Sequence, residues 1–466
     1  MGITGQLARR IVEIGYDQLD AEVVRRAKQA ILDGLAVAVA GSVQEAPTLA
    51  AEHVRDLGGL PVAGVWGFGF KTSPVMAAYV NGISTHVLDY EPMWSPPTHP
   101  VSPTVPVAFA LAESRPVAGK ELLVACVKGW EMQGRLRVAS CQHEPKALVF
   151  HPPGVVGVMG AAVVASHLLG LDEEALRHAL GIAASRAGGL IGNVGSMVKS
   201  THCGLAGAMG LDAALLASRG LTANPDILEA PKGFVEAFFP EGLDFDQLLM
   251  FGRPFRIVEP GLAIKLFPCQ YATHFAITAA LELHTRLKDP CKIASVTVIG
   301  PVMPYVDRPF PKSGLEGKFS FQYTTAAALL DGRVGIATFS DERRFRSDME
   351  AMLPRVRFVQ SPDIPATLEH MFVRVIVELE GDGHLEAICH APRGFWGQPL
   401  SDEEHLEKVR ECLAIRWGPA KVDAFVDMVR RLEVCGPEEV RDLASMLTSP
   451  GDTWSSGKEV THRELH

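Results

Sequence analysis

The sequence predicts a mainly α-helical protein with a smaller α+β part. Three observations support this fold class: apolar segments with helical periodicity fill residues 19–219, short alternating β-branched segments appear after residue 267, and helical patterns return from residue 401. A chain of 466 residues is expected to form about two or three domains. We expect two: an all-helical domain built from residues 1–266 and 401–466, and an α+β domain formed by residues 267–400.

The first half of the chain reads as a succession of helices. Residues 19–40 carry apolar side chains at a 3.6-residue period, and Gly41 is expected to end this helix as a C-cap. Asp172 is expected to be an N-cap, and Gly220 a helix stop. The same periodicity predicts helices over residues 73–87, 103–113, 119–137, 153–169, 172–185 and 205–219.

The second half mixes the two kinds of pattern. Residues 293–300 and 373–379 are short, alternating and rich in β-branched side chains, which predicts two half-buried strands. Residues 274–287 and 321–330 keep a helical period. Three more helical segments follow residue 401, and we expect them to pack back onto the first domain, so that the α+β part is an insertion.

Composition and charge exclude several classes of partner. The hydrophobic fraction is 47%, the charged fraction 21% and the net charge −10, as in an ordinary globular protein with an acidic surface. Nucleic acid and anionic membranes are bound through dense Lys/Arg clusters, and no such run occurs, so we expect neither as a partner. An anionic small molecule needs only a few local cations. The eight scattered cysteines and the absence of a signal-peptide pattern lead us to expect free thiols and a cytoplasmic location.

One apolar segment has the length of a membrane span. Residues 154–171 reach the usual threshold of about 18 residues. However, the segment contains several glycine and polar residues, lacks a Lys/Arg asymmetry at its flanks and has no second span to pair with. A central helix surrounded by other helices explains it better.

The most unusual stretch is HVLDYEPMWSPPTHPV at residues 86–101, which interrupts the helical pattern with titratable groups and four prolines. Proline fixes φ and biases the preceding residue toward extended backbone, so this stretch is expected to be a stiff loop. Such a loop can hold Asp89 and His99 in fixed positions as general acid or base. The alternative is a surface loop in which Asp89 caps a helix and the histidines are solvated.

Four further stretches place reactive side chains beside Gly/Pro bends. His151 precedes a helix N-terminus, where the macrodipole favours a neutral imidazole. Lys199 and His202 lie in a Gly-rich approach to the helix expected from residue 205, a geometry that suits a carboxylate or phosphate. The last two stretches bring Lys265, Cys269, Gln270 and His274, and Arg308, Lys312 and Tyr323. Any one of these stretches could instead be explained by side chains that pack in the core or by charged side chains exposed to solvent. The motifs of P-loops, dinucleotide sites, zinc hydrolases and serine hydrolases are absent.

The order of these stretches resembles the MmgE/PrpD family, which contains 2-methylcitrate dehydratases, cis-aconitate decarboxylases and iminodisuccinate epimerases. The resemblance runs through NGISTHVLDYE, THPVSPTVPVAFALAE, FHPPGVVG, VKSTHCGLAGAMG, KLFPCQYATHF and FSFQYTTAAALLDG. It implies a large helical domain built from both ends of the chain, a smaller α+β lid domain, and a homodimer with the active site between the domains. It implies no metal and no redox cofactor.

The family motifs carry over to individual positions. Asp89 matches the first aspartate of the family's D-F-D-D run, His99 the histidine of T-H-P, His151 that of H-P-P and Tyr323 the tyrosine of S-F-Q-Y. Lys199 matches the lysine before the glycine-flanked helix, and His274 the histidine after F-P-C. The chain departs from the pattern at Met93, where decarboxylase-like members carry threonine.

The chemistry shared by the family forms or protonates a carbanion-like centre next to a carboxylate. We hypothesise proton transfer by Asp89, His99 and His151, and a hydrogen bond or proton from Tyr323. Carboxylate binding is assigned to Lys199, His202, His274 and Arg308. The expected substrate is a small di- or tricarboxylate, with 2-methylcitrate-like dehydration slightly ahead of cis-aconitate-like decarboxylation, and epimerisation third. A non-catalytic polycarboxylate-binding paralogue is the alternative from a different class.

Overall fold

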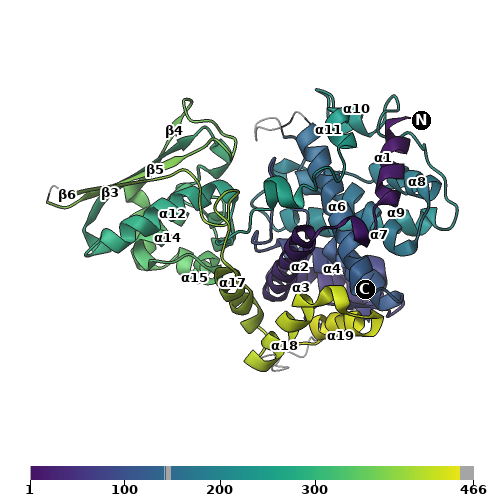
Figure 1. Ribbon diagram of the computed structural model, residues 1–466. Coiled ribbons are helices and arrows are strands. Elements are labelled where there is room, and N and C mark those ends of the chain that lie inside the picture. The colour runs from purple at the N-terminus through teal and green to yellow at the C-terminus, as the bar shows by residue number, and fades with distance from the viewer. Residues whose placement is uncertain (1, 141, 143–147, 382, 452–466) are drawn as a thin grey trace, which may run out of the picture.

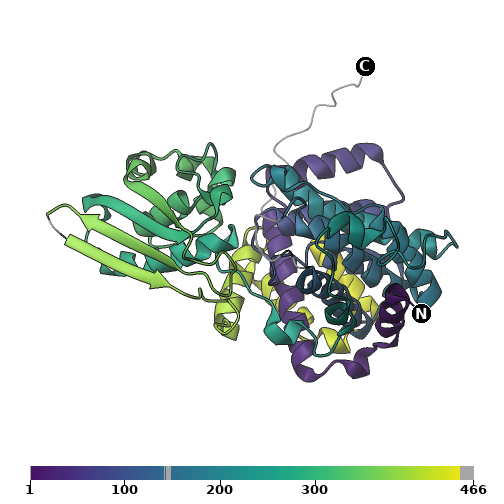
Figure 2. The same ribbon diagram turned by 90° about the horizontal axis from the view of Figure 1, so that it is seen from above.

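The computed structural model describes residues 2–140, 142, 148–381 and 383–451. The predicted fold class is confirmed, with 57% of residues in helices and 9% in strands. Two lobes are visible in Figure 1: a helical one that contains the N-terminus, and one built around a sheet. Figure 2 shows the same division from above, with the four long strands at the side remote from the helical lobe.

The helical lobe contains helices from both ends of the chain and a small hairpin. Its elements are α1 (Ile3–Glu13), α2 (Ala21–Gly41), α3 (Glu45–Leu57), β1 (Ala63–Val65), β2 (Phe70–Thr72), α4 (Pro74–His86), α5 (Val105–Ser114), α6 (Gly119–Ala139), α7 (Pro152–Leu169), α8 (Glu173–Ala184), α9 (Val198–Ala217), α10 (Phe234–Phe238), α11 (Phe245–Leu249), α17 (Asp402–Ala414), α18 (Pro419–Arg430) and α19 (Pro437–Thr448).

Three of these helices pack with their backbones in direct contact. A Cβ at Gly204 of α9 would lie 2.3 Å from the carbonyl oxygen of Tyr79 in α4, and one at Gly210 would lie 2.5 Å from that of Val158 in α7. Only glycine permits so close an approach. Histidines at the C-terminal end of α4 and the N-terminal ends of α7 and α9 are in ring contact. The close packing therefore brings these three helix ends together.

Helix α9 corrects the sequence-based prediction, because it begins at Val198 and not near residue 205. The hydroxyls of Ser200 and Thr201 donate to the carbonyl oxygens of Met197 and Val198, at 2.8 and 2.7 Å, so these polar residues are satisfied within the helix. Lys199 and His202 consequently lie in the first turns of α9 and not in a Gly-rich loop that precedes it.

Most other helix boundaries were predicted within a few residues. Asp172 caps α8 as expected, since its carboxylate accepts from the backbone N–H of Ala175 at 2.9 Å. Gly220 has a φ of +89° shortly after α9 ends, which suits the predicted stop. Gly41 is different: it is the last helical residue of α2, and a Cβ there would lie 1.9 Å from the carbonyl oxygen of Ser84. It is needed for helix contact and not for a C-cap.

Helix α7 is the single described helix that is long and apolar enough to cross a membrane. Of its apolar window, 83% is buried inside the protein. Its neighbours include α6 and α9, which pack along it. This matches the expectation of a central helix, and burial among other helices accounts for its uniformly apolar sequence.

The α+β lobe contains a four-stranded sheet with order β4-β3-β5-β6, in which β3 pairs parallel with β4 and antiparallel with β5. β3 and β5 were predicted, whereas the more polar β4 and β6 were not. Helices α12 and α14 pack against the sheet, on the side seen below it in Figure 1. The elements are α12 (Tyr271–Arg286), β3 (Ile293–Pro301), α13 (Gly314–Gly317), α14 (Phe321–Asp331), α15 (Asp341–Arg344), α16 (Ser347–Met352), β4 (Val356–Ser361), β5 (Val373–Leu379) and β6 (Gly383–Cys389).

The C-terminal helices return to the first lobe and reach the loop that follows α4. Lys408 of α17 donates to a carboxylate oxygen of Asp33 in α2 at 3.0 Å and to the carbonyl oxygen of Tyr90 at 2.9 Å. His405 Nε2 lies 3.1 Å from the second oxygen of Asp33. Apolar residues of α17, α18 and α19 join the core of the helical lobe, while residues 263–395 form a separate core. We propose domain boundaries near residues 266/267 and 400/401 on this basis.

The contact between α4 and α9 provides a test of the packing. Replacing Gly204 by valine places side-chain atoms against the backbone of α4, and overpacking of this kind costs typically about 1–3 kcal/mol. Urea unfolding of Gly204→Val is expected to show a loss of this size. Gly192→Ala is the matched control, because position 192 is exposed with open space around it. Equal stability of the two variants would contradict the described packing.

Candidate active site

The candidate site centres on the carboxylate of Asp89, just beyond the end of α4. Asp89 has a φ of +52°, in the left-handed region that aspartate tolerates better than most residues. Its backbone N–H donates to the carbonyl oxygen of His86 at 2.8 Å, which closes the turn. The side chain is only 3% exposed. A buried carboxylate requires compensating charge or hydrogen bonds.

Two ammonium groups supply that compensation from different parts of the chain. Lys199 Nζ in α9 lies 2.9 Å from Asp89 Oδ2. Lys265, in the segment that leads to the α+β lobe, donates to Asp89 Oδ1, to the Asp89 carbonyl oxygen at 2.9 Å and to the Cys269 carbonyl oxygen at 3.1 Å. Burial alone would raise the pKa of Asp89, but the two ammonium groups hold this pKa well below its usual range. Asp89 is therefore an anion.

Four imidazoles lie beside this ion cluster. The ring centroids of His86 and His99 are 4.7 Å apart, those of His86 and His151 5.5 Å, and those of His151 and His202 5.4 Å. Burial lowers the pKa of His99 and His151 well below the usual range, assisted by Lys265 for His99 and by Lys199 for His151. Burial and His86 lower the pKa of His202 to about 4. All are neutral near pH 7 and able to accept a proton.

Glu91 organises two of these rings. His86 Nδ1 donates to Glu91 Oε1 at 2.6 Å, and the hydroxyl of Ser102 donates to the same oxygen at 2.9 Å. His99 lies between two carboxylates, with Nε2 3.5 Å from Asp89 Oδ1 and Nδ1 3.4 Å from Glu91 Oε1. His86 Nε2, Glu91 Oε2 and His99 Nδ1 are buried without a hydrogen-bond partner among the described residues. Buried polar atoms without a hydrogen-bond partner are expected where a ligand or water completes the site.

A cleft between the two lobes leads to the cluster. It is lined by residues of the helical lobe, including His86, Asp89 and Lys199, and by residues of the α+β lobe, including Lys318 and Phe319. His99 and His151 do not line this cleft themselves and contact His86 from behind. A small anion in the cleft would therefore meet the ammonium groups first, with the imidazoles adjacent.

The structure brings five of the eight predicted site residues together and places the other three elsewhere. Asp89, His99, His151, Lys199 and His202 converge as described. The Tyr323 hydroxyl instead donates to the Thr338 carbonyl oxygen, and the side chain lies in the core of the α+β lobe. Helix α14 turns this tyrosine toward the interior, and burial raises its pKa to about 12.

Arg308 and His274 also lie outside the cluster. Arg308 donates to the carbonyl oxygen of Val194 in the helical lobe at 3.3 Å and pairs with Glu316 at 3.4 Å, so it bridges the lobes. His274 is fully buried and stacks on Tyr271 with the ring centroids 4.6 Å apart. It does not line the cleft, although Lys265 is close enough to add to the effect of burial in lowering its pKa.

Sequence reasoning assigned no role to four residues that the structure brings to the site: His86, Glu91, Lys265 and Lys318. His86 and Glu91 belong to the proline-rich stretch, and Lys265 belongs to KLFPCQ. The sequence therefore indicated three of the four residues as titratable groups in candidate stretches, but not their roles. Lys318 precedes FSFQY, and nothing in its local pattern distinguishes it from a surface lysine. Its ammonium group donates to the Val87 carbonyl oxygen at 3.2 Å.

The cluster also contains two sets of possible metal ligands. Ligand atoms of His86, Glu91 and His99 lie within 4.8 Å of one another, as do those of His86, His151 and Cys203. Burial lowers the pKa of His86, and Lys199 lies close enough to add to the lowering. A resident ammonium group disfavours a second cation and favours an anion at this position, so the donor set fits an anionic ligand better than a metal ion.

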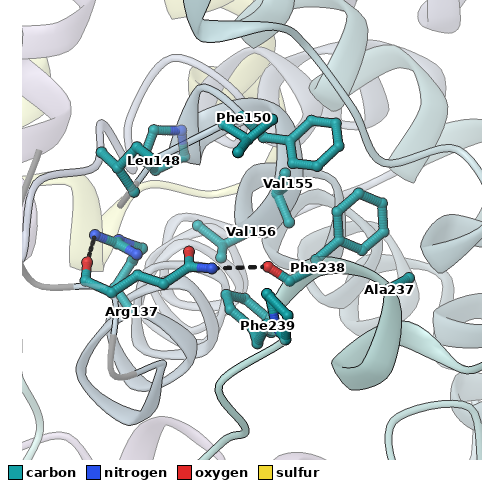
Figure 3. A pocket seen from close by; sticks show the side chains of 12 residues that line it. Arg137, Leu148, Phe150, Val155, Val156, Ala237, Phe238 and Phe239 are labelled. Carbon is teal, nitrogen blue, oxygen red and sulfur yellow. Dashed lines mark hydrogen bonds between the residues drawn. The ribbon is translucent and has the colours of Figure 1, made fainter. Parts of the chain in front are cut away.

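A second pocket lies on the other side of the α7 N-terminus, and Figure 3 shows its apolar walls, which include Phe150, Phe238 and Phe239. Its one guanidinium, that of Arg137, donates to the Gln142 carbonyl oxygen at 2.9 Å and to the Ser140 hydroxyl at 3.1 Å. The pocket thus offers apolar contact and few free polar groups. It suits a polycarboxylate much less well than the cleft does.

The site as a whole is that of an acid–base enzyme: neutral imidazoles, fixed ammonium groups and an ionised carboxylate surround a cleft between two lobes. Comparison with known proteins agrees. The model of the MmgE/PrpD N-terminal domain matches residues 5–246, and that of the MmgE/PrpD C-terminal domain matches residues 267–434. The chain belongs to the MmgE/PrpD family.

Relatives of known activity cover most of the chain. Cis-aconitate decarboxylase of Mus musculus is 32% identical over 96% of both chains, and that of Homo sapiens is 31% identical over 96% of this chain and 95% of its own. The 2-methylcitrate dehydratase of Cupriavidus necator is 25% identical over 78% of this chain and 80% of its own. Both activities are lyase activities, and this chain is an enzyme of the lyase class.

Because buried histidines with depressed pKa values dominate the cluster, stability should depend on pH. Below about pH 6.5 the unfolded chain binds protons that the folded chain excludes, so the free energy of unfolding falls as pH falls. Each imidazole that stays neutral at pH 5 contributes a loss of up to about 2 kcal/mol. Calorimetry between pH 8 and 5 should show a steep fall in Tm below pH 6.5.

Two variants sharpen this measurement. His274→Phe removes one buried imidazole and should flatten the dependence of Tm on pH, whereas replacement of the exposed His53 by glutamine should leave it unchanged. A Tm that is constant over the range would contradict the description of neutral buried rings.

The position of Tyr323 predicts a separation of stability from activity. Tyr323→Phe removes the hydrogen bond to Thr338 and should lower the free energy of unfolding by about 1–2 kcal/mol. The value of kcat should change little, because the hydroxyl does not face the cleft. A large loss of kcat with unchanged stability would indicate that Tyr323 takes part in catalysis.

Proposed function

We propose that the protein decarboxylates a small unsaturated tricarboxylate of the cis-aconitate type, without a metal or redox cofactor. The observation that carries this proposal is the buried cluster in which two ammonium groups and neutral imidazoles surround Asp89 at the end of a cleft between the lobes. Fixed cations suit a substrate with several carboxylates, and neutral imidazoles suit proton transfer beside them.

The reaction requires one bond to break and one proton to move. The carbon–carbon bond to a carboxylate breaks and releases carbon dioxide, its electron pair shifts the double bond, and a proton adds to the carbon at which the charge ends. The developing charge is next to another carboxylate, so ammonium groups lower the barrier. In our assignment Lys199 holds a carboxylate while remaining close to Asp89, and Lys265, whose three donors go to Asp89 and to the Cys269 carbonyl oxygen, keeps Asp89 in place.

His99 is our candidate for the proton transfer, acting through His86, which lines the cleft and whose ring centroid lies 4.7 Å from that of His99. Its two ring nitrogens face Asp89 and Glu91, which fix the orientation of the ring. An incoming substrate carboxylate would stabilise the imidazolium, so that a ring that is neutral in the free enzyme can carry the proton that the reaction consumes. His151, which is in ring contact with His86, and His202 extend the cluster, with their Nδ1 atoms 3.3 Å apart.

The sequence alone favours dehydration slightly over decarboxylation, whereas similarity to the relatives supports decarboxylation as the first candidate. The two mammalian decarboxylases are more similar to this chain, and over more of its length, than the dehydratase of Cupriavidus necator. Dehydration of 2-methylcitrate is our second candidate, because the same groups can remove a proton beside a carboxylate and protonate a leaving hydroxyl. Epimerisation comes third.

Met93 does not count against the proposal. Its backbone N–H and carbonyl pair with Ala263, both at 3.0 Å, and its side chain is 2% exposed within the core of the α+β lobe. The residue therefore ties the loop after α4 to the second lobe. The side chain that stands in place of threonine serves packing between the lobes.

We also propose a homodimer in the cytoplasm. A group of exposed apolar side chains occurs near the start of α9, formed by Leu190, Met197, Val198 and Leu205, and such a patch suits a protein contact. The seven described cysteines are all free thiols, as expected in a reducing compartment; Cys141 lies outside the described residues.

Direct assay of a substrate panel tests the function. Purified protein is incubated with cis-aconitate, 2-methylcitrate and an aspartate-derived imine in D2O, and products are followed by NMR. Decarboxylation of cis-aconitate with one deuterium incorporated, unaffected by a chelator, is the expected result. Turnover of 2-methylcitrate alone would favour the second candidate. Thermal stabilisation by a polycarboxylate without turnover or exchange of any compound would indicate a binding protein.

His99→Gln tests the assignment of the proton transfer. General acid–base groups contribute about 10²–10⁴-fold in rate, so kcat for the active compound should fall by that factor. Glutamine keeps much of the polar shape, and the Tm should stay near that of the wild type. His53→Gln on α3 is the control and should retain full activity. A His99→Gln enzyme with wild-type kcat would remove His99 from the proton path.

A further inference from the structure

Lys318 differs from Lys199 and Lys265 in having no carboxylate partner among the described residues. Lys199 and Lys265 each form an ion pair with Asp89. Lys318 forms none with any carboxylate of the described residues, although its side chain is only 4% exposed. Its one hydrogen bond is to a backbone carbonyl, that of Val87. A buried ammonium group without a counter-ion is costly.

The position of Lys318 relates it to the site. It lines the same cleft as Asp89 and Lys199, but it comes from the opposite lobe, directly after α13. Burial lowers its pKa to about 8, while Asp89 acts in the opposite direction and Lys199 adds to the lowering. The group is therefore mostly protonated near pH 7. An ammonium group has three donors, so two remain for a ligand.

We infer that Lys318 is a specificity-determining residue that binds the substrate carboxylate most remote from the reacting carbon. This inference rests on the proposed function in that it concerns the same cleft, and it extends that function by naming the group that recognises a third carboxylate. Lys199 and Lys265 share the charge of Asp89, whereas Lys318 brings to the cleft an ammonium group whose described contacts are the Val87 carbonyl oxygen and the ring of Phe339. A tricarboxylate can pair with it through a carboxylate that a dicarboxylate lacks.

The competing explanation is that Lys318 only joins the lobes through Val87. The two roles differ in what they predict for ligands. A joining role affects all ligands equally and lowers stability, whereas carboxylate recognition affects only ligands that carry the third carboxylate. Removal of a buried charge that lacks a partner should not lower the Tm and can raise it.

The test compares two ligands that differ by one terminal carboxylate. Binding of tricarballylate and of methylsuccinate is measured by calorimetry for the wild type, Lys318→Met, Lys318→Arg and the exposed Lys312→Met as control. We expect Lys318→Met to weaken tricarballylate binding by about tenfold or more, the size of a lost charged hydrogen bond, and to leave methylsuccinate binding nearly unchanged. Lys318→Arg should restore much of the difference, and Lys312→Met should change neither.

Equal weakening of both ligands by Lys318→Met, or no weakening of either, would overturn the inference. Because both ligands are inert, this result does not depend on which reaction the enzyme catalyses, so failure of the substrate panel and failure of the Lys318 assignment are separate outcomes. If cis-aconitate is turned over, Lys318→Met should raise its KM with a much smaller change in kcat, which a loss of lobe contact would not produce.

Discussion

The interaction on which the rest of the site depends is the neutralisation of one buried carboxylate by two ammonium groups from separate parts of the chain. Asp89 follows α4, Lys199 belongs to α9, and Lys265 stands at the start of the segment that leads into the second lobe. None of the three could be buried alone at acceptable cost. Their mutual pairing therefore fixes where three distant segments meet.

The charge balance of this group also explains the state of the imidazoles around it. Burial lowers the pKa values of the histidines, and Lys199 and Lys265 add to that effect, so the imidazoles are neutral although Asp89 acts in the opposite direction. The free site is in this way prepared for an anion: positive groups are present before the ligand arrives, and the bases are unprotonated. The helix packing through Gly204 and Gly210 brings the ring-bearing helix ends together.

Much of this could be predicted from the sequence because the signals were local. Helical periodicity located most helices, and the stiff loop drew attention to Asp89 and His99. Contacts that depend on tertiary packing could not be predicted from the sequence. Tyr323 shares a recognisable motif with catalytic residues of the family, yet the orientation of α14 directs its hydroxyl to Thr338. Lys318 resembled a solvated lysine because only the approach of the two lobes buries it. The start of α9 was misplaced because serine and threonine inside a helix look like a loop until their hydroxyls find backbone partners.

The contact of α17 with the loop after α4 has a consequence for biosynthesis. Lys408 supplies a donor to the Tyr90 carbonyl and a counter-charge to Asp33, yet it follows these residues by 318 and 375 positions in the chain. A nascent chain can form α2 and α4 long before that, but with a buried aspartate that still lacks its partner. The loop after α4 can thus reach its final support only after the α+β lobe and α17 have been synthesised, which delays a fully supported cleft until then.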